Sequence, residues 1–539
     1  MPDAAPARPE PFRVADAGPL HDGDMAEVDA GGTRVLLARV GGRLHACAAV
    51  CPHYGAPLAT GVLDGPHVVC PWHHARFDVT TGALCDPPSL DGLASYAVEE
   101  RADGVYVTVE GPARIEPPAP PERARDNRLF LVLGAGAAAQ AAAEALRSEG
   151  FAGRIVLTTP EADAPYDRTK LSKAYAAGTA GDAALPLRDA AFHARLGIET
   201  RTGHTAEALD ADAKTVRFAT GETLSYDACL IATGGLPRRL PVPGADLPGV
   251  HVLRSHADAR ALVARLDGVT TAVVVGASFI GMEAASSLRE RGIGVTVVDR
   301  AAVPLAAALG EAVGGVFRDA AEAKGVAFRM EAGVERIETD GGGLAVVLAS
   351  GERLAAGVVV MGVGVAPATG FLAGHAFRRA DGGVETDAAL RVADGLFAAG
   401  DVAAVPDASG RRVRIEHWRL AQQHGRAAAR AMLGATEPFR GVPFFWTGQF
   451  GVALRYVGHA ESPDETVVVG SLGDRKFVAY AIEDGRAVAA LAVGRDADAA
   501  AFHHLLARGA AVTADEVRAG FDPQAALREA APREAAGAA

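Results

Sequence analysis

Two short cysteine and histidine pairs carry the clearest chemistry in the sequence. One residue separates Cys51 from His53, and after sixteen intervening residues Cys70 is separated by two residues from His73. Two thiolates and two imidazoles suit either a tetrahedral zinc ion or a two-iron sulfur cluster with mixed ligands. We therefore predict a metal centre that has these four residues as ligands.

A glycine-rich turn forms the second pattern, where the apolar run before Gly134 leads into an alanine-rich segment. Gly134 permits a tight turn, Gly136 lets the backbone approach a pyrophosphate, and Ala139 allows a helix to pack closely on a strand. The turn predicts a dinucleotide site.

A similar turn follows near residue 276, where Gly276 and Gly281 frame Ser278. Asp299 comes 23 residues after Gly276, at the end of the next expected strand. An acid at that distance binds the adenosine 2′-hydroxyl and repels a 2′-phosphate. NADH is therefore predicted over NADPH, although the neighbouring Arg300 weakens this preference because arginine accommodates the phosphate.

The length and composition indicate which elements must position these residues. A chain of 539 residues exceeds a single domain, and hydrophobic and charged residues at 49% and 22% indicate globular folding. The net charge of −13 disfavours nucleic acid or an anionic membrane as the main partner. The start of the chain lacks a secretory pattern, so a cytoplasmic protein is expected. The longest uncharged stretch, 354–377, contains glycines and Pro367, so we predict a buried strand and loop, with no membrane span.

The pattern of strands, turns and helices predicts a multidomain fold. An all-β domain, a proline-rich linker, two Rossmann-like α/β domains and a C-terminal α+β domain with an Ala/Glu tail are expected. Their predicted ranges are 12–111 for the β domain, 112–127 for the linker, 128–245 with 371–440 for the first α/β domain, 246–370 for the second, and 441–539 for the last.

The segment around the cysteine and histidine pairs, CPHYGAPLATGVLDGPHVVCPWHHARFDVTTG, closely resembles the Rieske ferredoxin motif. The resemblance implies a 2Fe-2S cluster with Cys51 and Cys70 on one iron and His53 and His73 on the other. His74 is predicted not to bind iron. No hydroxyl side chain follows His73 directly, so we predict a midpoint potential toward the low end of the Rieske range of about −150 to +300 mV.

The remaining motifs resemble the flavoprotein reductases of the ferredoxin reductase and apoptosis-inducing factor type. The matching segments are PYDRTKLSK at 165–173, YDACLIATGG at 226–235 and DGLFAAGDVA at 394–403. The resemblance implies FAD at the first turn and NADH at the second. It implies cofactor-binding roles for Glu161, Arg168, Lys173, Thr233, Gly234, Glu283, Gly400, Asp401 and Trp418. Lys173 and Glu283 are candidate neighbours of the flavin and the nicotinamide, whereas Trp418 and Trp446 could equally be core aromatics.

Taken over most of the chain, the resemblance is to apoptosis-inducing-factor-like flavoproteins that carry a Rieske domain. It implies electron transfer from NADH through FAD to the cluster, and then to an oxygenase, ferredoxin or cytochrome that docks at an exposed edge formed by His53 and His73. No CxxC is present, which excludes the disulfide-reducing relatives. One alternative is a redox-sensing interaction protein with incidental NADH oxidation. Another is a complete oxygenase with iron at His251 and His256, which lacks a well-placed carboxylate.

Overall fold

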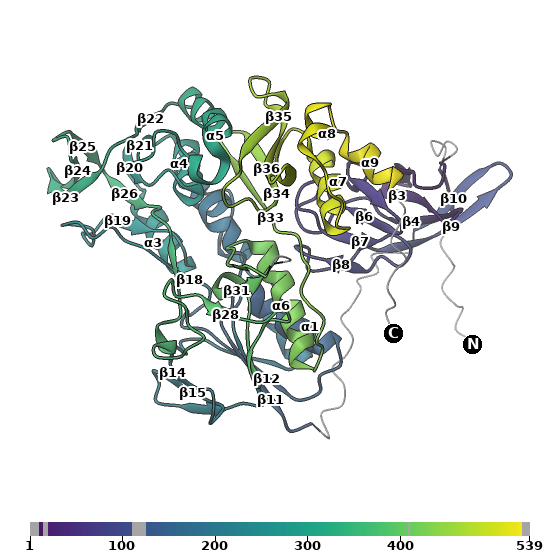
Figure 1. Ribbon diagram of the computed structural model, residues 1–539, viewed down its shortest axis with the longest axis horizontal. Coiled ribbons are helices and arrows are strands. Elements are labelled where there is room, and N and C mark those ends of the chain that lie inside the picture. The colour runs from purple at the N-terminus through teal and green to yellow at the C-terminus, as the bar shows by residue number, and fades with distance from the viewer. Residues whose placement is uncertain (1–9, 15–19, 110–125, 408–409, 531–539) are drawn as a thin grey trace, which may run out of the picture.

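The computed structural model describes residues 10–14, 20–109, 126–407 and 410–530 (Figure 1). It confirms the predicted fold class, because an all-β region, two parallel sheets covered by helices and a C-terminal α+β region follow one another along the chain. Most of the predicted linker, 112–127, and the end of the Ala/Glu tail lie outside the described residues. The exact domain boundaries stay predictions.

The N-terminal region consists of two antiparallel sheets. The larger one has the strand order β1-β10-β9-β4-β3-β2 and the smaller one β5-β6-β7-β8. The loop with Cys70 and His73 joins β6 to β7 of the smaller sheet, and the loop with Cys51 and His53 follows β4 of the larger one. The strands are β1 Phe12–Val14, β2 Met25–Ala30, β3 Thr33–Val40, β4 Arg43–Ala48, β5 Val62–Asp64, β6 His67–Val69, β7 Arg76–Asp78, β8 Leu84–Asp86, β9 Ser95–Arg101 and β10 Gly104–Thr108.

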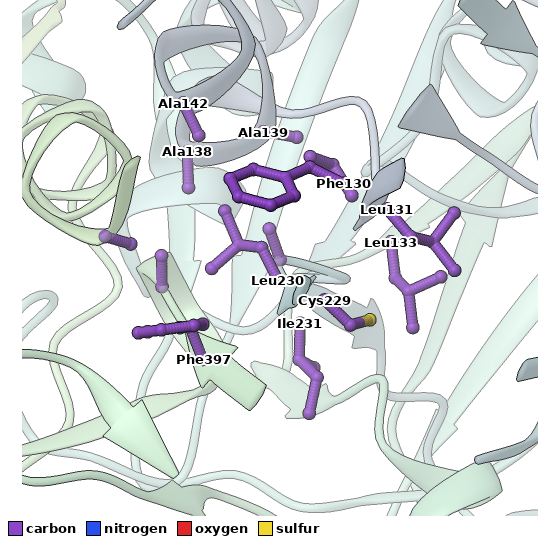
Figure 2. Close-up of a cluster of buried hydrophobic side chains, with 14 of the residues drawn as sticks. Phe130, Leu131, Leu133, Ala138, Ala139, Ala142, Cys229, Leu230, Ile231 and Phe397 are labelled. Carbon is purple, nitrogen blue, oxygen red and sulfur yellow. The ribbon is translucent and has the colours of Figure 1, made fainter. Parts of the chain in front are cut away.

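The first parallel sheet has the order β13-β12-β11-β17-β30-β29, with only β29 antiparallel. Phe130, Leu230 and Phe397 from three of its strands form its core together with Ala138 and Ala142 of helix α1 (Figure 2). Helix α6 packs tightly on α1 because Gly425 has no side chain. A Cβ at this position would clash with the carbonyl of Ala138. The elements are β11 Leu129–Leu133, α1 Ala137–Ser148, β12 Arg154–Thr158, β13 Ile198–Arg201, β17 Ala228–Ile231, β29 Arg391–Ala393, β30 Leu396–Ala398 and α6 Trp418–Met432.

The second parallel sheet has the order β19-β26-β20-β21-β22. Its strands are rich in valine and buried, as expected for a sheet that helices cover. Helix α3 begins with a capping box in which Ser255 and Asp258 satisfy each other's backbone amides. The elements are β19 Val250–Val252, α3 His256–Arg265, β20 Thr271–Val275, α4 Phe279–Glu290, β21 Gly294–Val298, α5 Ala306–Ala323, β22 Val326–Arg329 and β26 Val358–Met361.

Smaller elements connect the two parallel sheets. Three sheets of three strands and one strand pair flank them, and a short helix precedes β13. These are β14 Ala206–Asp210, β15 Thr215–Phe218 and β16 Thr223–Ser225; β23 Val334–Asp340, β24 Gly343–Leu348 and β25 Arg353–Ala356; β28 Val384–Glu385, β31 Ala403–Pro406 and β32 Arg412–Val413; the pair β18 Gly235–Pro237 and β27 Val365–Pro367; and helix α2 Ala190–Leu196.

The C-terminal region is an antiparallel sheet of order β33-β34-β37-β36-β35 followed by three helices. The α+β character predicted for this region is confirmed. The elements are β33 Phe444–Gln449, β34 Val452–Gly458, β35 Glu465–Ser471, β36 Lys476–Glu483, β37 Arg486–Val493, α7 Asp496–Ala507, α8 Ala514–Arg518 and α9 Pro523–Glu529.

Helices α7 and α9 lie against the N-terminal β region (Figure 1). Val62 and Val69 form one buried apolar cluster with Leu505 and Leu527. Beside this cluster, His504 Nδ1 lies 2.8 Å from a carboxylate oxygen of Asp64. Apolar burial and a polar contact therefore hold the metal-binding region on the C-terminal region. Within the described residues, no helix has the length and apolar character needed to cross a membrane.

Candidate functional site

The two predicted metal-binding loops share one backbone design. The Cys51 carbonyl accepts from the Gly55 amide at 2.9 Å, and the Cys70 carbonyl accepts from the His74 amide at 3.0 Å. Both Gly55 and His74 have positive φ, at +79° and +57°. His74 therefore completes the second loop through its backbone, and its buried imidazole turns away to meet His503 Nδ1 at 2.8 Å. This geometry explains how a residue next to a predicted ligand can serve packing instead.

The four predicted ligands meet as two like pairs. Nδ1 of His53 lies 3.0 Å from Nδ1 of His73, and the thiols of Cys51 and Cys70 lie within hydrogen-bonding reach of each other. No three His, Cys, Asp or Glu side chains converge on one point among the described residues. Two sulfurs in one pair and two nitrogens in another fit two iron atoms better than one zinc ion.

Burial sets the protonation state of the two imidazoles. It lowers the pKa of His53 to about 4 and that of His73 well below its ordinary value. Both rings are therefore neutral near pH 7, which is the form that binds metal. Burial also raises the pKa of Cys47 to about 12 and that of Cys229 above its usual range, so these two thiols pack as protonated, apolar side chains.

The imidazole edge faces the interior, which corrects the expectation of an exposed edge at His53 and His73. His73 is only 7% exposed and His53 is half-buried. The indole of Trp446 covers both rings, at centroid distances of 4.3 Å from His73 and 5.8 Å from His53. The sequence could not show this, because Trp446 comes from β33, almost 400 residues later in the chain.

The same edge also contacts the first α/β domain. The Tyr54 hydroxyl donates to Asp167 Oδ2 at 2.8 Å and lies 3.3 Å from the Thr169 hydroxyl. The Tyr54 ring stacks on His53 at a centroid distance of 4.1 Å. Tyr54 therefore links the metal-binding loop to the PYDRTKLSK segment that the sequence assigned to the flavin.

A cavity of about 1050 Å³ lies between the two parallel sheets and β33. Trp446 and Thr169 both line it, so the imidazole pair is separated from this cavity by a single layer of side chains. Of the residues predicted to bind cofactor, those that line it are Gly134, Gly136, Glu161, Arg168, Lys173, Thr233, Gly234, Glu283, Gly400, Asp401 and Trp418. Ala139 does not line it and is fully buried in the core, where it provides the close helix packing that its position predicts.

The shape and polarity of the cavity fit a dinucleotide at the first turn. Gly134 has φ of +128°, and a Cβ there would lie 2.2 Å from the carbonyl of Ala232. A Cβ on Gly136 would meet nothing within 4 Å, so the backbone at this residue is open to the cavity. The buried hydroxyl of Thr233 has no partner among the described residues and lies at the same wall. A bound pyrophosphate or flavin would satisfy such groups.

The predicted polar residues of the cavity are held by partners from other segments. Arg168 pairs with Glu161 and also donates to the Tyr166 hydroxyl at 2.7 Å. Asp401 pairs with Arg254 at 2.8 Å. Arg254 was missed by the sequence reasoning, because an arginine in an unremarkable loop gives no motif. The roles of these residues toward a cofactor stay predictions.

Lys173 and Glu283 meet at the junction of the two α/β domains. Lys173 Nζ lies 3.0 Å from Glu283 Oε2, and the Glu283 side chain is 4% exposed. The hydroxyls of Ser172 and Thr447 donate to the same carboxylate at 2.5 and 2.7 Å. A buried carboxylate with a cation and two donors is fully compensated, so this pair forms a rigid polar contact beside the cavity.

The second turn follows β20. Its residues Ser278, Phe279 and Ile280 line the large cavity, whereas the predicted ligands Gly276, Gly281 and Asp299 do not. A Cβ on Gly281 would lie 1.9 Å from the carbonyl of Gly276, so the helix and the turn touch. The Ser278 hydroxyl donates to the Gly362 carbonyl at 2.7 Å, so this side chain lies against the end of β26. Asp299 accepts from the amide of Ala277 at 2.6 Å, which places the predicted ribose ligand at the turn.

The alternative iron site of a complete oxygenase gains no support from the geometry. His256 lies 3.0 Å from Asp182 and 3.3 Å from Asp163, which are polar contacts to separate carboxylates. His251 lies in β19 and has an unpartnered Nε2 among the described residues. The two histidines and a carboxylate do not form a three-ligand group in the part of the chain that the structure describes.

Comparisons with known families match three consecutive models. Residues 10–97 match the Rieske 2Fe-2S domain, residues 129–425 the pyridine nucleotide-disulphide oxidoreductases, and residues 444–531 the reductase C-terminal domain. The first match confirms the predicted cluster over the zinc alternative.

Individual relatives agree with these matches. Apoptosis-inducing factor 3 of Mus musculus is 37% identical over 519 residues, which cover 92% of this chain and 84% of that protein. The ferredoxin–NAD(+) reductase component of the anthranilate 1,2-dioxygenase system of Burkholderia cepacia is 37% identical over 71% of this chain and 94% of its own length.

Solved structures of reductases also match this chain over about three quarters of its length. A ferredoxin reductase from Rhodopseudomonas palustris superposes with a TM-score of 0.71 at 30% identity, over 74% of this chain and all of that one. The putidaredoxin reductase–putidaredoxin complex matches with a TM-score of 0.71 at 27% identity, over 76% of this chain and all of that one. The chain therefore belongs to the pyridine nucleotide-disulphide oxidoreductase family, as an FAD- and NADH-dependent oxidoreductase with a Rieske 2Fe-2S domain.

Proposed function

We propose that this protein takes electrons from NADH through FAD to its own Rieske cluster and passes them to a separate redox protein. The contact between Trp446 and His73 carries the proposal, since it brings a cluster ligand to the wall of the flavin cavity. When bound, the flavin accepts a two-electron hydride and releases single electrons, which a one-electron cluster can accept.

The residues of this chain position the dinucleotides and exclude water from the path between the cavity and the imidazole pair. Gly134 and Gly136 hold a pyrophosphate against the backbone, and Asp299 selects an adenosine ribose without a 2′-phosphate. Lys173 and Glu283 fix the junction between the two dinucleotide domains. Trp446 separates the cavity from the imidazole pair, so electrons cross a packed aromatic layer rather than solvent. No side-chain acid or nucleophile is required.

The proposed acceptor is an oxygenase, a ferredoxin or a cytochrome. The Burkholderia relative is named as the reductase component of a dioxygenase system, and the putidaredoxin reductase match is a complex with putidaredoxin, which supports an electron-supply role. Because the imidazole edge is covered by Trp446 and Tyr54, the acceptor has to dock on another face of the Rieske domain in this arrangement.

The Cys70→Ser variant tests the order of electron flow. We expect it to lose the visible absorption and electron paramagnetic resonance signals of the cluster, while NADH still bleaches the flavin. Cys47→Ala is the matched control, because this buried thiol is not a ligand and its loss should leave the cluster signals intact. If flavin bleaching also failed in a correctly folded Cys70→Ser protein, the proposed order would be wrong.

A redox-sensing role is the second candidate, favoured by the match to apoptosis-inducing factor 3 over 92% of this chain. In that role NADH reduction would alter an interaction surface, and turnover would be slow. Steady-state reduction of an artificial one-electron acceptor distinguishes the two functions. Rapid turnover supports the reductase, whereas single-turnover reduction followed by a stable reduced state supports the sensor.

A further inference from the structure

A second, smaller cavity lies where the Rieske domain meets helix α6. Its volume is about 300 Å³, and it is lined by Arg76 at the start of β7, Asp86 at the end of β8, and Gln423, Arg426 and Arg430 of α6, with Arg440 in the loop before β33. The cavity does not overlap the lining of the flavin cavity. It is therefore a separate site between two domains.

The lining carries more positive than negative charge. Four arginines face it, namely Arg76, Arg426, Arg430 and Arg440, whereas Asp86 and Glu437 are its only carboxylates among the described residues. Arg430 is paired with Glu149 outside the lining at 2.7 Å, so the excess rests on the other three arginines. The whole chain has a net charge of −13, so this local excess runs against the overall composition. A concentration of guanidinium groups in a cavity attracts anions from solution.

The partly buried carboxylate of Asp86 already has partners. Asp86 accepts from Arg419 at 2.7 Å and from the Gln423 amide at 3.0 Å. Arg419 is 2% exposed, and its charge offsets that of Asp86. Asp86 therefore adds little net negative charge to the cavity.

Two arginines between the domains, Arg76 and Arg426, form no ion pair with a carboxylate of the described residues. Arg426 makes a long contact of 3.4 Å to the Cys85 carbonyl, and no carboxylate within the described residues forms an ion pair with it. The Nε atom of Arg76 is buried and has no hydrogen-bond partner in the same part of the chain. Burial lowers the pKa of Arg426, and the nearby Arg430 lowers it further, against the attraction of Asp86. Placing guanidinium groups in this environment is costly unless an anion completes their hydrogen bonds.

We propose that this cavity binds a small multivalent oxyanion, which Arg76 and Arg426 hold from opposite domains. The planar guanidinium fork matches phosphate and carboxylate oxygens and makes short charge-assisted hydrogen bonds to them. The volume is at the lower end of the range for small-molecule sites, which suits an inorganic phosphate, a pyrophosphate or a small polycarboxylate. Arg440 also lines the cavity and is exposed to solvent. The site is independent of the electron-transfer function.

Calorimetric titration of the holoenzyme tests the site. The probes are inorganic phosphate, pyrophosphate and citrate, each at constant ionic strength in a chloride buffer that contains saturating NAD+ to occupy the other phosphate-binding turn. We expect one saturable site, with binding weakened about tenfold or more in Arg426→Gln and in Arg440→Gln. Arg318→Gln is the matched control, because this exposed arginine of α5 lies far along the chain from the cavity and removes the same charge.

Hydrogen exchange gives a second readout. The anion should slow exchange in segments 76–86 and 423–441 together, since it contacts both domains. Because Arg426→Gln could weaken the interface itself, the flavin and cluster absorption spectra serve to check folding, and the exposed Arg440→Gln provides the variant least able to disturb packing. Equal binding by both variants and the wild type, equal loss in Arg318→Gln, or protection confined to one segment would each overturn the proposal.

Discussion

The indole of Trp446 and the imidazole of His73 lie 4.3 Å apart, centroid to centroid, with their planes inclined by 50°. Trp446 belongs to the reductase C-terminal region and His73 to the Rieske domain, so this ring contact is one of those that join the two ends of the chain. The same indole lines the flavin cavity. This contact places the predicted cluster and the predicted flavin on opposite sides of one side chain.

Replacing Trp446 should slow electron transfer within the protein. In Trp446→Leu the packing that orients His73 is lost, and a displacement of about 1 Å can reduce a rate by roughly 10²-fold. We expect NADH to reduce the flavin at the wild-type rate in stopped-flow measurements, while the cluster signal appears more slowly. Trp446→Phe keeps an aromatic ring and should recover much of the rate. An unchanged rate of cluster reduction in the leucine variant would show that the indole is only a packing residue.

The Lys173–Glu283 contact should behave as a coupled buried pair. Lys173→Met leaves the Glu283 carboxylate buried without its cation, and we expect the free energy of unfolding to fall by about 3 kcal/mol. Chemical denaturation with FAD bound measures this. The double variant Lys173→Met with Glu283→Gln removes both charges and should regain most of the loss. Additive losses in the double variant would mean that the two side chains act independently.

Asp299 should control the choice between NADH and NADPH. In Asp299→Asn the side chain can still accept from the Ala277 amide, but it no longer repels a 2′-phosphate. We expect the ratio of kcat/KM for NADPH over NADH to rise about tenfold, the size expected for one charged hydrogen bond. Asp319→Asn, an exposed change on α5, is the control. If the ratio moved equally in both variants, general surface charge would explain the preference.

Buried His424 should make the stability fall in mildly acidic solution. Burial lowers its pKa to about 4, whereas an unfolded chain takes up this proton near pH 6.5. Between these values the unfolded state binds more protons, so the free energy of unfolding drops as the pH falls from about 6.5 to 4, by about 3 kcal/mol for this group. Above that range the group contributes no pH dependence.

Denaturation at several pH values compares the wild type with His424→Phe. The His424 ring packs edge-on against Phe439 at 4.6 Å, so a phenyl ring can occupy much of its space without titrating. The variant should show a flatter pH profile over this interval. Parallel profiles would mean that other groups dominate the acid response.

The sequence by itself determined a metal centre, two dinucleotide turns and the order of domains, and the resemblance of its motifs to known families implied the cofactors. The ligand spacing at Cys51, His53, Cys70 and His73 and the glycine turns at Gly134 and Gly276 are local patterns, and their chemistry depends on residues within one loop or one strand–turn–helix unit. Such short-range constraints can be read without knowing the rest of the fold. The fold class followed for the same reason, since alternation of strands and helices along the chain predicts parallel sheets.

Only the tertiary structure decided which way the cluster edge faces. Trp446, Tyr54 and Arg254 reach their partners across more than a hundred residues, through domain packing that no local pattern encodes. The expectation of an exposed edge at His53 and His73 was wrong for this reason. Domain packing also places Arg76 and Arg426, 350 residues apart in the chain, on the lining of one cavity.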